Sequence, residues 1–370
     1  MAVFKVSNKK QQRDFIFFPR HLYKKDLFWV PPIWFEERNA YSKKKNPILA
    51  NSDFILCLAT QNGRVVGRNL VYVDHTYNNF CKTEIGFFGA FECIDEVSVA
   101  RELMEFAEDW LGKRGMKSIR GPIHPVAENW GFLYEGFDTT PVYMSPYNPG
   151  YYNKLLVQLD YEKIKDLLVY EADTKKGYEI PPRFLRFYDR FFKRYPGFTL
   201  RRLNLKNLDK DAEAIWKLSN IAYQDNWGYV PLDYNVLKDM IRKLKIIVDI
   251  DAVWIVEDNG VPVAYCLGFP DLNIILKEIQ GKIFPFGFLK ILKKIKHLQD
   301  YRLFGMAVHP RYHNLGLDAL LYVHLSKALS PKKVRLEANY ILEDNYKIRN
   351  ALEKLNLTPI KTYRIYQKHL

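Results

Sequence analysis

The most informative stretch of the chain reads VHPRYHNLGLDALL, from Val308 to Leu321. An apolar run from Leu303 leads into it and is typical of a buried strand, which Pro310 ends because proline has no N–H for the sheet. A polar loop then reaches Gly316, and leucines recur behind it at helical spacing. The N-terminus of such a helix exposes backbone N–H groups, so the stretch predicts a phosphate or pyrophosphate site. A strand–loop–helix joint that binds nothing is the alternative.

Composition favours two domains with large cores and an acidic partner. The chain has 370 residues, 48% of them hydrophobic, and a formal net charge of +14. That length fits two domains of roughly 100–200 residues each. The positive charge favours phosphorylated cofactors, nucleic acid or an anionic membrane surface. A solvated basic surface without a specific partner is the alternative.

The four cysteines are scattered and form no CxxC pair. This pattern argues against a disulfide scaffold and against a zinc site, so we expect no metal and a reducing, cytoplasmic location. The N-terminus lacks the apolar core of a signal peptide, and no apolar run approaches the roughly 18 residues of a membrane span. We therefore expect a protein that is soluble, or at most peripheral to a membrane.

The second half of the chain repeats the pattern of the first. Each half has two β-rich runs around an Asn-Gly turn, at Asn62-Gly63 and at Asn259-Gly260. The segment from Tyr23 to Pro31 matches the segment from Tyr223 to Pro231, and the residues Asp160, Lys165 and Tyr170 match Asn356, Lys361 and Tyr366 in spacing. We therefore predict a duplicated unit, with one domain at 1–180, a linker helix at 181–198 and a second domain at 199–370.

The two copies differ at two places. Where the second copy has the glycine loop, the first has Cys93 to Ser98, which carries two acids and no glycine. Acids repel a phosphate, so the first copy is interpreted as degenerate. The second copy has an apolar and lysine-rich insertion at 274–296. This insertion is predicted to lie on an anionic membrane surface, to shape an apolar acceptor pocket, or to cover its own domain as an amphipathic helix.

The order of elements, with Val308-x-Pro310 followed by His313-x-x-Gly316-Leu317-Asp318, resembles the GCN5-related N-acetyltransferase (GNAT) superfamily and its bacterial tandem members. Asn345-x-x-Ile348, Lys354 and Asn356-Leu357 resemble a later family segment that contacts CoA. The resemblance implies an α/β (α+β) fold of two GNAT-like domains, each a mixed, mostly antiparallel central sheet flanked by helices. It also implies acetyl-CoA or another acyl-CoA as co-substrate, bound by the second domain.

The resemblance implies that CoA is bound by residues of the strand and loop around Gly316 and by one asparagine later in the chain. These residues are Met306, Val308, His313, Asn314, Leu315, Gly316, Leu317, Asp318, Ala319 and Asn345. Three residues depart from the family pattern. His313 stands in place of Arg or Gln, and Asp318 stands in place of Gly or Ala. Leu352 occupies the position of a tyrosine that protonates the leaving thiolate, which puts that step in doubt.

The candidates for catalysis are Glu337, His309 and Tyr346. A base must take a proton from the attacking ammonium, and Glu337 on an apolar strand is the first candidate; an ion pair with Arg335 is its structural alternative. The candidates for substrate binding share an aromatic or acidic character: Asp225, Trp227, Tyr229 and Asp271. An aromatic plug under the loop and an Asx turn are the structural alternatives.

The predicted function is acyl-CoA-dependent N-acyl transfer, of an acetyl or other acyl group, to a small-molecule or peptide amine. Two alternatives stay open. The first is a transferase that uses aminoacyl-tRNA, although the chain has no recognisable nucleic-acid motif. The second is a non-catalytic protein that binds a ligand or lies on a membrane. The acceptor and the acyl length are not determined by the sequence.

Overall fold

The computed structural model describes residues 1–125, 129–231, 233–245 and 247–370. Two compact units make up the chain. Unit 1 comprises Met1–Leu167, Asn273–Gly287 and Lys361–Leu370, and unit 2 comprises Leu168–Leu272 and Phe288–Ile360. Each unit is described by itself below.

The elements of the first half follow one another in this order: β1 (Ala2–Lys5), α1 (Lys9–Leu22), α2 (Trp34–Ala40), α3 (Pro47–Ala50), β2 (Ser52–Gln61), β3 (Arg64–Asp74), α4 (His75–Cys81), β4 (Ile85–Cys93), α5 (Val97–Gly112), β5 (Ser118–Gly121), β6 (Phe132–Glu135), α6 (Tyr151–Val157), β7 (Glu162–Asp173) and the short 3₁₀ helix η1 (Thr174–Lys176).

The second half continues with α7 (Pro182–Arg194), β8 (Phe198–Arg202), α8 (Leu208–Ala222), α9 (Tyr234–Leu244), η2 (Ile250–Ala252), β9 (Val253–Asp258), β10 (Val261–Pro270), α10 (Asn273–Ile279), α11 (Gly287–Lys294), η3 (Ile295–His297), β11 (Asp300–Val308), η4 (Pro310–Tyr312), α12 (Leu317–Leu329), η5 (Ser330–Lys332), β12 (Arg335–Leu342), α13 (Tyr346–Lys354) and β13 (Thr358–His369). The order strand, helix, hairpin, strand, helix, strand, helix, strand occurs in both halves, as the sequence repeat indicated.

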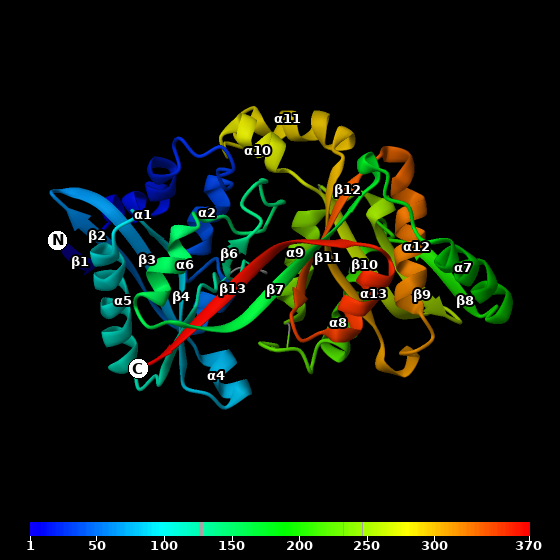
Figure 1. Ribbon diagram of the computed structural model, residues 1–370, viewed down its shortest axis with the longest axis horizontal. Coiled ribbons are helices and arrows are strands. Elements are labelled where there is room, and N and C mark those ends of the chain that lie inside the picture. Colours follow the sequence, from blue (N-terminus) through cyan, green and yellow to red (C-terminus); the bar gives the residue numbers. More distant parts are fainter. Residues whose placement is uncertain (126–128, 232, 246) are drawn as a thin grey trace. The chain divides into compact units, whose positions relative to one another are not determined.

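The sheet of unit 1 runs in the order β1-β2-β3-β4-β5-β13, and β6 pairs with β13 (Figure 1). In unit 2 the order is β12-β11-β10-β9-β8. The pairs β4/β5 and β11/β12 are parallel, whereas the hairpins β2/β3 and β9/β10 are antiparallel. Each unit is thus a mixed, mostly antiparallel sheet with flanking helices, which confirms the predicted fold class.

Two strands cross from one unit to the other. β7 passes into unit 2 at Leu168, and β13 passes into unit 1 at Lys361. Within unit 1, β13 pairs with β5, with Tyr366 opposite Gly121, and Arg364 of β13 forms an ion pair with Asp166 of β7 at 2.8 Å. Most of β13 therefore belongs to unit 1 although it ends the second half of the sequence, and β7 is divided between the units. The domain boundaries at 180 and 198 stay a prediction from the sequence.

Successive residues of a strand point to opposite faces of the sheet. In unit 1 both faces carry apolar residues, and helices cover both. One face of β2 and β3 packs Ile55, Cys57 and Val71 against the apolar stripe of α5. The opposite face packs Leu56, Leu58 and Leu70 against the segment of α1 that contains Phe15 and Ile16.

Unit 2 is built in the same way. Trp254, Val256 and Cys266 face α12, whose buried side chains include Leu320 and Leu321. Val253, Ile255 and Tyr265 face α8 on the other side. Within the described residues, no helix has both the length and the apolarity to cross a bilayer.

Candidate functional site

A cluster of buried polar side chains lies in unit 1, where the strand β4 ends. We call it the Glu92 cluster, and it consists of Tyr23, Glu37, Arg68, Glu92 and Tyr152. Glu92 lies on β4, Arg68 lies opposite it on β3, and the tyrosines come from the end of α1 and from α6. Glu37 lies on α2, so five elements bring these side chains together.

A β-bulge in β4 sets the direction of the Glu92 side chain. The β3/β4 register shifts between Arg68 and Leu70, and Ala90 adopts a φ of 48°, in the left-handed region. A bulge bends a strand and re-aims the side chains beside it, and bulges are frequent next to active sites. Here the bulge immediately precedes Phe91 and Glu92.

The Glu92 carboxylate accepts two tyrosine hydrogen bonds. Tyr152 donates its hydroxyl proton at 2.8 Å, and the Tyr23 hydroxyl donates to the same oxygen. The Tyr152 oxygen in turn accepts the backbone N–H of Cys93 at 3.0 Å. These contacts hold the carboxylate in one orientation at the end of β4.

Arg68 provides the positive charge of the cluster. Its guanidinium lies 3.8 Å from a Glu92 oxygen and 3.5 Å from a Glu37 oxygen, and its side chain is only 5% exposed. One guanidinium nitrogen also donates to the carbonyl oxygen of Phe15 at 2.9 Å. Two carboxylates thus share one buried cation, an arrangement that tolerates a proton on one of them.

Burial raises the pKa of Glu92 to about 7, although Arg68 and the two tyrosine hydroxyls favour the carboxylate form. Burial also raises the pKa values of Tyr23 and Tyr152 well above the usual 10, so both remain neutral donors. A carboxyl group that titrates near neutral pH can accept a proton and release it again, which is the requirement for a general base.

The cluster opens into a cavity of about 340 Å³, within the size range of small-molecule sites. Its walls are mostly apolar and aromatic and include Trp29, Pro31 and Phe132, and its polar lining residues include Arg68 and Glu92. His124 also lines the cavity. Burial lowers its pKa to about 4, so the imidazole is neutral at pH 7, and its Nδ1 has no hydrogen-bond partner among the described residues. The cavity therefore combines apolar walls with a few convergent polar groups.

Unit 2 lacks these charges at the equivalent positions. Arg68 and Glu92 face each other in the β3/β4 ladder, one step from the Gly67 and Cys93 pair. In the β10/β11 ladder the equivalent pair is Tyr265 and Ala307. Tyr223, the counterpart of Tyr23, donates instead to the Met306 carbonyl oxygen at 2.8 Å. The buried carboxyl group and its cation are thus features of the first copy.

The predicted cofactor loop lies in unit 2 and has the predicted strand–loop–helix form. β11 ends at Val308, Pro310–Tyr312 form the 3₁₀ helix η4, and α12 begins at Leu317 without a side-chain cap. His313 and Asn314 are exposed, Leu315, Asp318 and Ala319 are half-buried, and Met306 is half-buried on β11. The first N–H groups of α12 are therefore available to an anion, with the Asp318 carboxylate in the same helical turn.

Gly316 has a packing reason as well as a conformational one. Its φ is 77°, and a Cβ added there would lie 2.6 Å from the Phe187 ring of α7. Gly316, predicted from the sequence to allow close approach of a pyrophosphate, is thus also required for the packing of Phe187.

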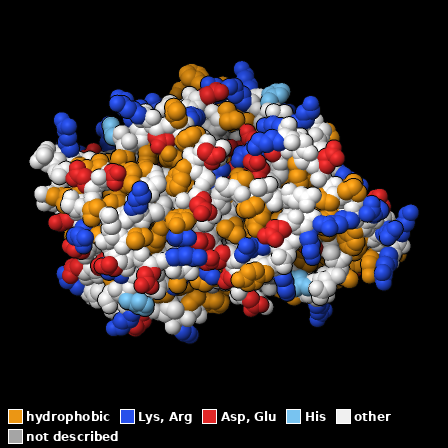
Figure 2. All heavy atoms as spheres, in the orientation of Figure 1, with side chains coloured by type: hydrophobic (Ala, Val, Ile, Leu, Met, Phe, Trp, Pro, Cys, Tyr) orange, Lys and Arg blue, Asp and Glu red, His pale blue; other side chains and the backbone are white. Residues whose placement is uncertain are grey.

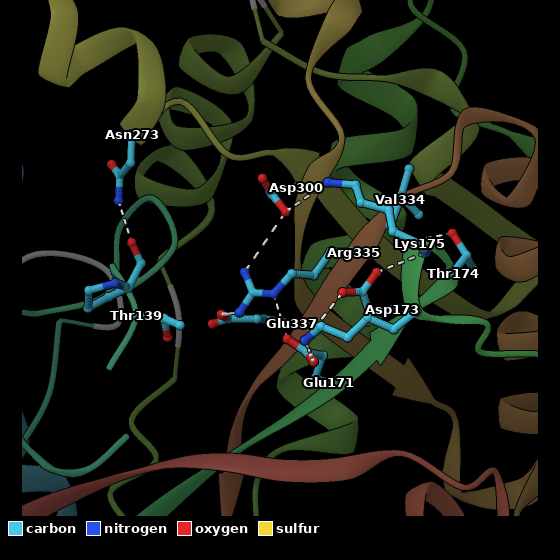
Figure 3. Close-up of polar contacts among 12 residues, drawn as sticks. Thr139, Glu171, Asp173, Thr174, Lys175, Asn273, Asp300, Val334, Arg335 and Glu337 are labelled. Carbon is cyan, nitrogen blue, oxygen red and sulfur yellow. Dashed lines mark hydrogen bonds and ion pairs between the residues drawn. The ribbon is translucent and has the colours of Figure 1, made fainter. Parts of the chain in front are cut away.

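Glu337 is fully buried on β12 and forms an ion pair with Arg335 (Figure 3). Arg335 in turn contacts Glu171 of β7 and lies 4.0 Å from Asp300 of β11. Lys175 lies 3.5 Å from the same Asp300 oxygen. The predicted base is thus part of a buried ion-pair network in unit 2.

The other predicted catalytic residues lie at loop and helix ends. His309 precedes η4, and its Nδ1 accepts the backbone N–H of Arg311 at 3.2 Å. Tyr346 begins α13 and is 65% exposed. Asn345, predicted to contact CoA, caps α13 by accepting the Ile348 N–H at 3.3 Å.

The predicted acceptor residues lie at two places in unit 2. Asp225, Trp227 and Tyr229 follow α8; Asp225 is exposed, and the Tyr229 hydroxyl donates to the Asn220 side chain at 2.9 Å. Asp271 follows β10, is buried, and its backbone N–H donates to the Asp300 carbonyl oxygen at 2.7 Å.

Arg68 and Glu92 are not among the site residues predicted from the sequence. A signal was present, because each charge lies within or directly after an apolar, β-rich run, and charged residues are seldom fully buried unless they are paired. Their pairing depends on the β3/β4 register, which no local pattern specifies.

No model of a known protein family matches the chain. The chain is 31% identical to Protein YghO of Escherichia coli, over 98% of this chain and 94% of that protein. It is 30% identical to a bacterial ceramide synthase of Caulobacter vibrioides, over 100% of this chain and 98% of that protein.

Solved structures agree with the fold. A tandem GNAT protein from the clavulanic acid biosynthesis pathway aligns with a TM-score of 0.60 at 11% identity, covering 100% of this chain and 98% of that one. A GCN5-related N-acetyltransferase from Anabaena variabilis aligns with a TM-score of 0.50 at 10% identity, covering 99% of this chain and 72% of that one. With its duplicated fold and its two full-length relatives, the chain belongs to the tandem GNAT family.

Proposed function

We propose that the protein is an N-acyltransferase that moves an acyl group from acyl-CoA to the amine of a long-chain amino alcohol. The observation that carries the proposal is Glu92, a carboxyl group with a pKa of about 7 in the wall of a mostly apolar cavity. The GNAT fold supports acyl transfer to nitrogen. The name of the ceramide synthase relative supports the acceptor class, since a ceramide is an amide of a fatty acid with a long-chain amino alcohol.

In this proposal, Glu92 is the general base. Its carboxylate takes a proton from the acceptor ammonium, and the neutral amine attacks the thioester carbonyl carbon. The C–N bond forms, the C–S bond breaks, and the remaining extra proton on the nitrogen passes to the departing thiolate, so the products are the amide and the CoA thiol. Tyr23 and Tyr152 hold the carboxylate, and Arg68 balances its charge before the proton arrives.

The cavity suits an acceptor with one polar end. The alkyl chain would lie along Trp29 and Phe132, and the amine would lie at Glu92. The neutral imidazole of His124 can exchange a hydrogen bond with a hydroxyl group of the acceptor. A site with buried polar groups rejects an analogue that leaves them unpaired, so an amino alcohol should be preferred over a simple alkylamine.

The direct test combines the purified full chain with acyl-CoA and with amines of increasing chain length, and it detects the amide by mass spectrometry. Formation of the amide from a long-chain amino alcohol supports the proposal. If no amine gives an amide while free CoA also fails to appear, the proposal is rejected.

A larger side chain in the cavity wall should shift the preference of the protein toward acceptors with shorter alkyl chains. Ala40 is buried in the cavity wall, and Ala40→Phe would occupy space there. We expect KM for a long-chain acceptor to rise about tenfold or more, because its alkyl chain no longer fits, while a short-chain acceptor changes by less than threefold. Steady-state kinetics with both acceptors measures the ratio; an equal change for both contradicts an alkyl chain at Ala40.

The sequence predicts a donor site at the N-terminus of α12 in unit 2, where the pyrophosphate of CoA would bind, and this prediction is tested independently of the role of Glu92 in unit 1. Asp318 opposes this binding, because an anion in the first turn competes with a second anion. Asp318→Asn should therefore tighten CoA binding by about two- to fivefold, measured by isothermal titration calorimetry. A matched change at an exposed acid distant in sequence, Asp53→Asn, should leave CoA affinity unchanged. Unaltered affinity in both variants places the pyrophosphate elsewhere.

A further inference from the structure

The insertion at 273–296 exposes an unusual number of large apolar side chains. Phe284 and Phe286, in the turn between α10 and α11, are each 76% exposed. On α11, Leu289 is 53% exposed and Leu292 is 43% exposed. Single exposed apolar residues are ordinary, but several within one short segment mark an interaction surface.

The same segment is strongly basic. Between Gly281 and His297 the sequence contains five lysines and no acid: Lys282, Lys290, Lys293, Lys294 and Lys296. Ile291 is buried and attaches α11 to the protein, whereas the leucines and most of the lysines remain accessible. In Figure 2, hydrophobic side chains lie beside Lys or Arg side chains along the upper edge, where Figure 1 places α11.

The other end of the insertion forms part of the cavity wall in unit 1. Asn273 and Leu276 of α10 line the cavity. The Asn273 side chain points to the loop after β6 and donates to the Pro141 carbonyl oxygen at 2.6 Å (Figure 3). α10 therefore lines the cavity and also leads into the turn that contains the exposed phenylalanines.

Contacts with the segment before α2 fix the turn that follows α10. The Trp34 indole N–H donates to the Gln280 carbonyl oxygen at 2.9 Å. A Cβ added to Gly281 would lie 2.0 Å from the Pro32 carbonyl oxygen, so only glycine permits this approach. The turn with Phe284 and Phe286 is thus attached to the residues around the cavity.

We propose that the insertion binds an anionic phospholipid bilayer, with its phenylalanines and leucines between the acyl chains and its lysines against the phosphates. A run of lysines without an acid complements anionic headgroups, and each lysine adds to the attraction. The bilayer is also where a long-chain amino alcohol resides, so Phe284 and Phe286, which belong to unit 1 together with the cavity, would hold the cavity at the source of its acceptor. Membrane binding rests on the insertion alone, whereas acceptor uptake rests on the proposed function.

Vesicle sedimentation of the full chain tests the inference. We expect at least about tenfold more binding to vesicles of 70% phosphatidylcholine and 30% phosphatidylglycerol than to pure phosphatidylcholine, decreasing as salt rises. Phe284→Ser with Phe286→Ser, and separately Lys293→Glu with Lys294→Glu and Lys296→Glu, should each reduce binding about tenfold or more.

The matched control replaces three other exposed, consecutive lysines, as Lys43→Glu, Lys44→Glu and Lys45→Glu. It makes the same change in net charge and should retain most of the binding. Equal binding of the wild type and both insertion variants, or equal loss in the control, overturns the inference. Circular dichroism verifies folding. Acyl transfer assayed in the same samples separates the two ideas, because vesicle binding without transfer to any amine counts against the proposed function alone.

Discussion

Glu92→Gln should abolish most acyl transfer while the protein stays folded. Glutamine keeps the size of the side chain and can still accept the hydrogen bonds from Tyr23 and Tyr152, but it does not take a proton. Loss of a general base lowers kcat by roughly 100- to 10,000-fold. We therefore expect a decrease in kcat of at least about 100-fold, measured with saturating donor and acceptor.

The pH dependence gives a second readout of the same residue. In the proposed mechanism the active form of Glu92 is the carboxylate, and its pKa in the free protein is about 7, so kcat/KM for the acceptor should rise with pH through about 7 and level off above it. Glu92→Gln should remove this limb from the residual activity. The control is Glu84→Gln, an exposed glutamate just before β4. Wild-type kcat in Glu92→Gln, or an unchanged pH profile, would show that Glu92 is not the base.

Arg335→Met should destabilise the protein strongly without abolishing acyl transfer. Glu337 has no exposed surface, and Arg335 is its ion-pair partner. Removal of one member of a buried ion pair leaves the other charge uncompensated and typically costs about 3–5 kcal/mol. We expect a loss of about 3 kcal/mol in unfolding free energy by urea denaturation, and kcat per folded molecule within about threefold of the wild type.

Glu337→Gln decides between the two roles of this glutamate. If Glu337 is structural, the variant should have a lower unfolding midpoint and a nearly normal kcat. If Glu337 is catalytic, the variant should have a nearly normal unfolding midpoint and a much lower kcat. Lys113→Met is a matched control for ion-pair loss, since Lys113 and Asp109 form a pair with side chains 70% and 61% exposed. Exposed pairs contribute little to stability, so this variant should unfold like the wild type.

Much of the architecture could be predicted from local patterns. Asn62-Gly63 and Asn259-Gly260 both form the expected hairpins, because an Asn-Gly pair adopts the positive φ angles that a two-residue turn requires. The apolar stripe after Val97 and the leucines after Gly316 form α5 and α12 as expected. Recurrence of these signals in order also indicated the duplication. Local chemistry dominates such elements, so the sequence was sufficient to recognise them.

The location of the buried carboxyl group Glu92 depended on tertiary structure. Glu92 and Arg68 become partners only when β3 and β4 pair in one register, and Tyr23 and Tyr152 join them only when α1 and α6 pack nearby. The last strands were also ambiguous: Lys165 and Tyr170 in β7 repeat the spacing of Lys361 and Tyr366 in β13, so either strand satisfies the same local pattern. The sequence by itself determined the repeated elements and the tandem GNAT-like plan. Long-range pairing decided which strand completes which unit and which copy contains the buried carboxylate, because both depend on contacts between residues distant in the chain.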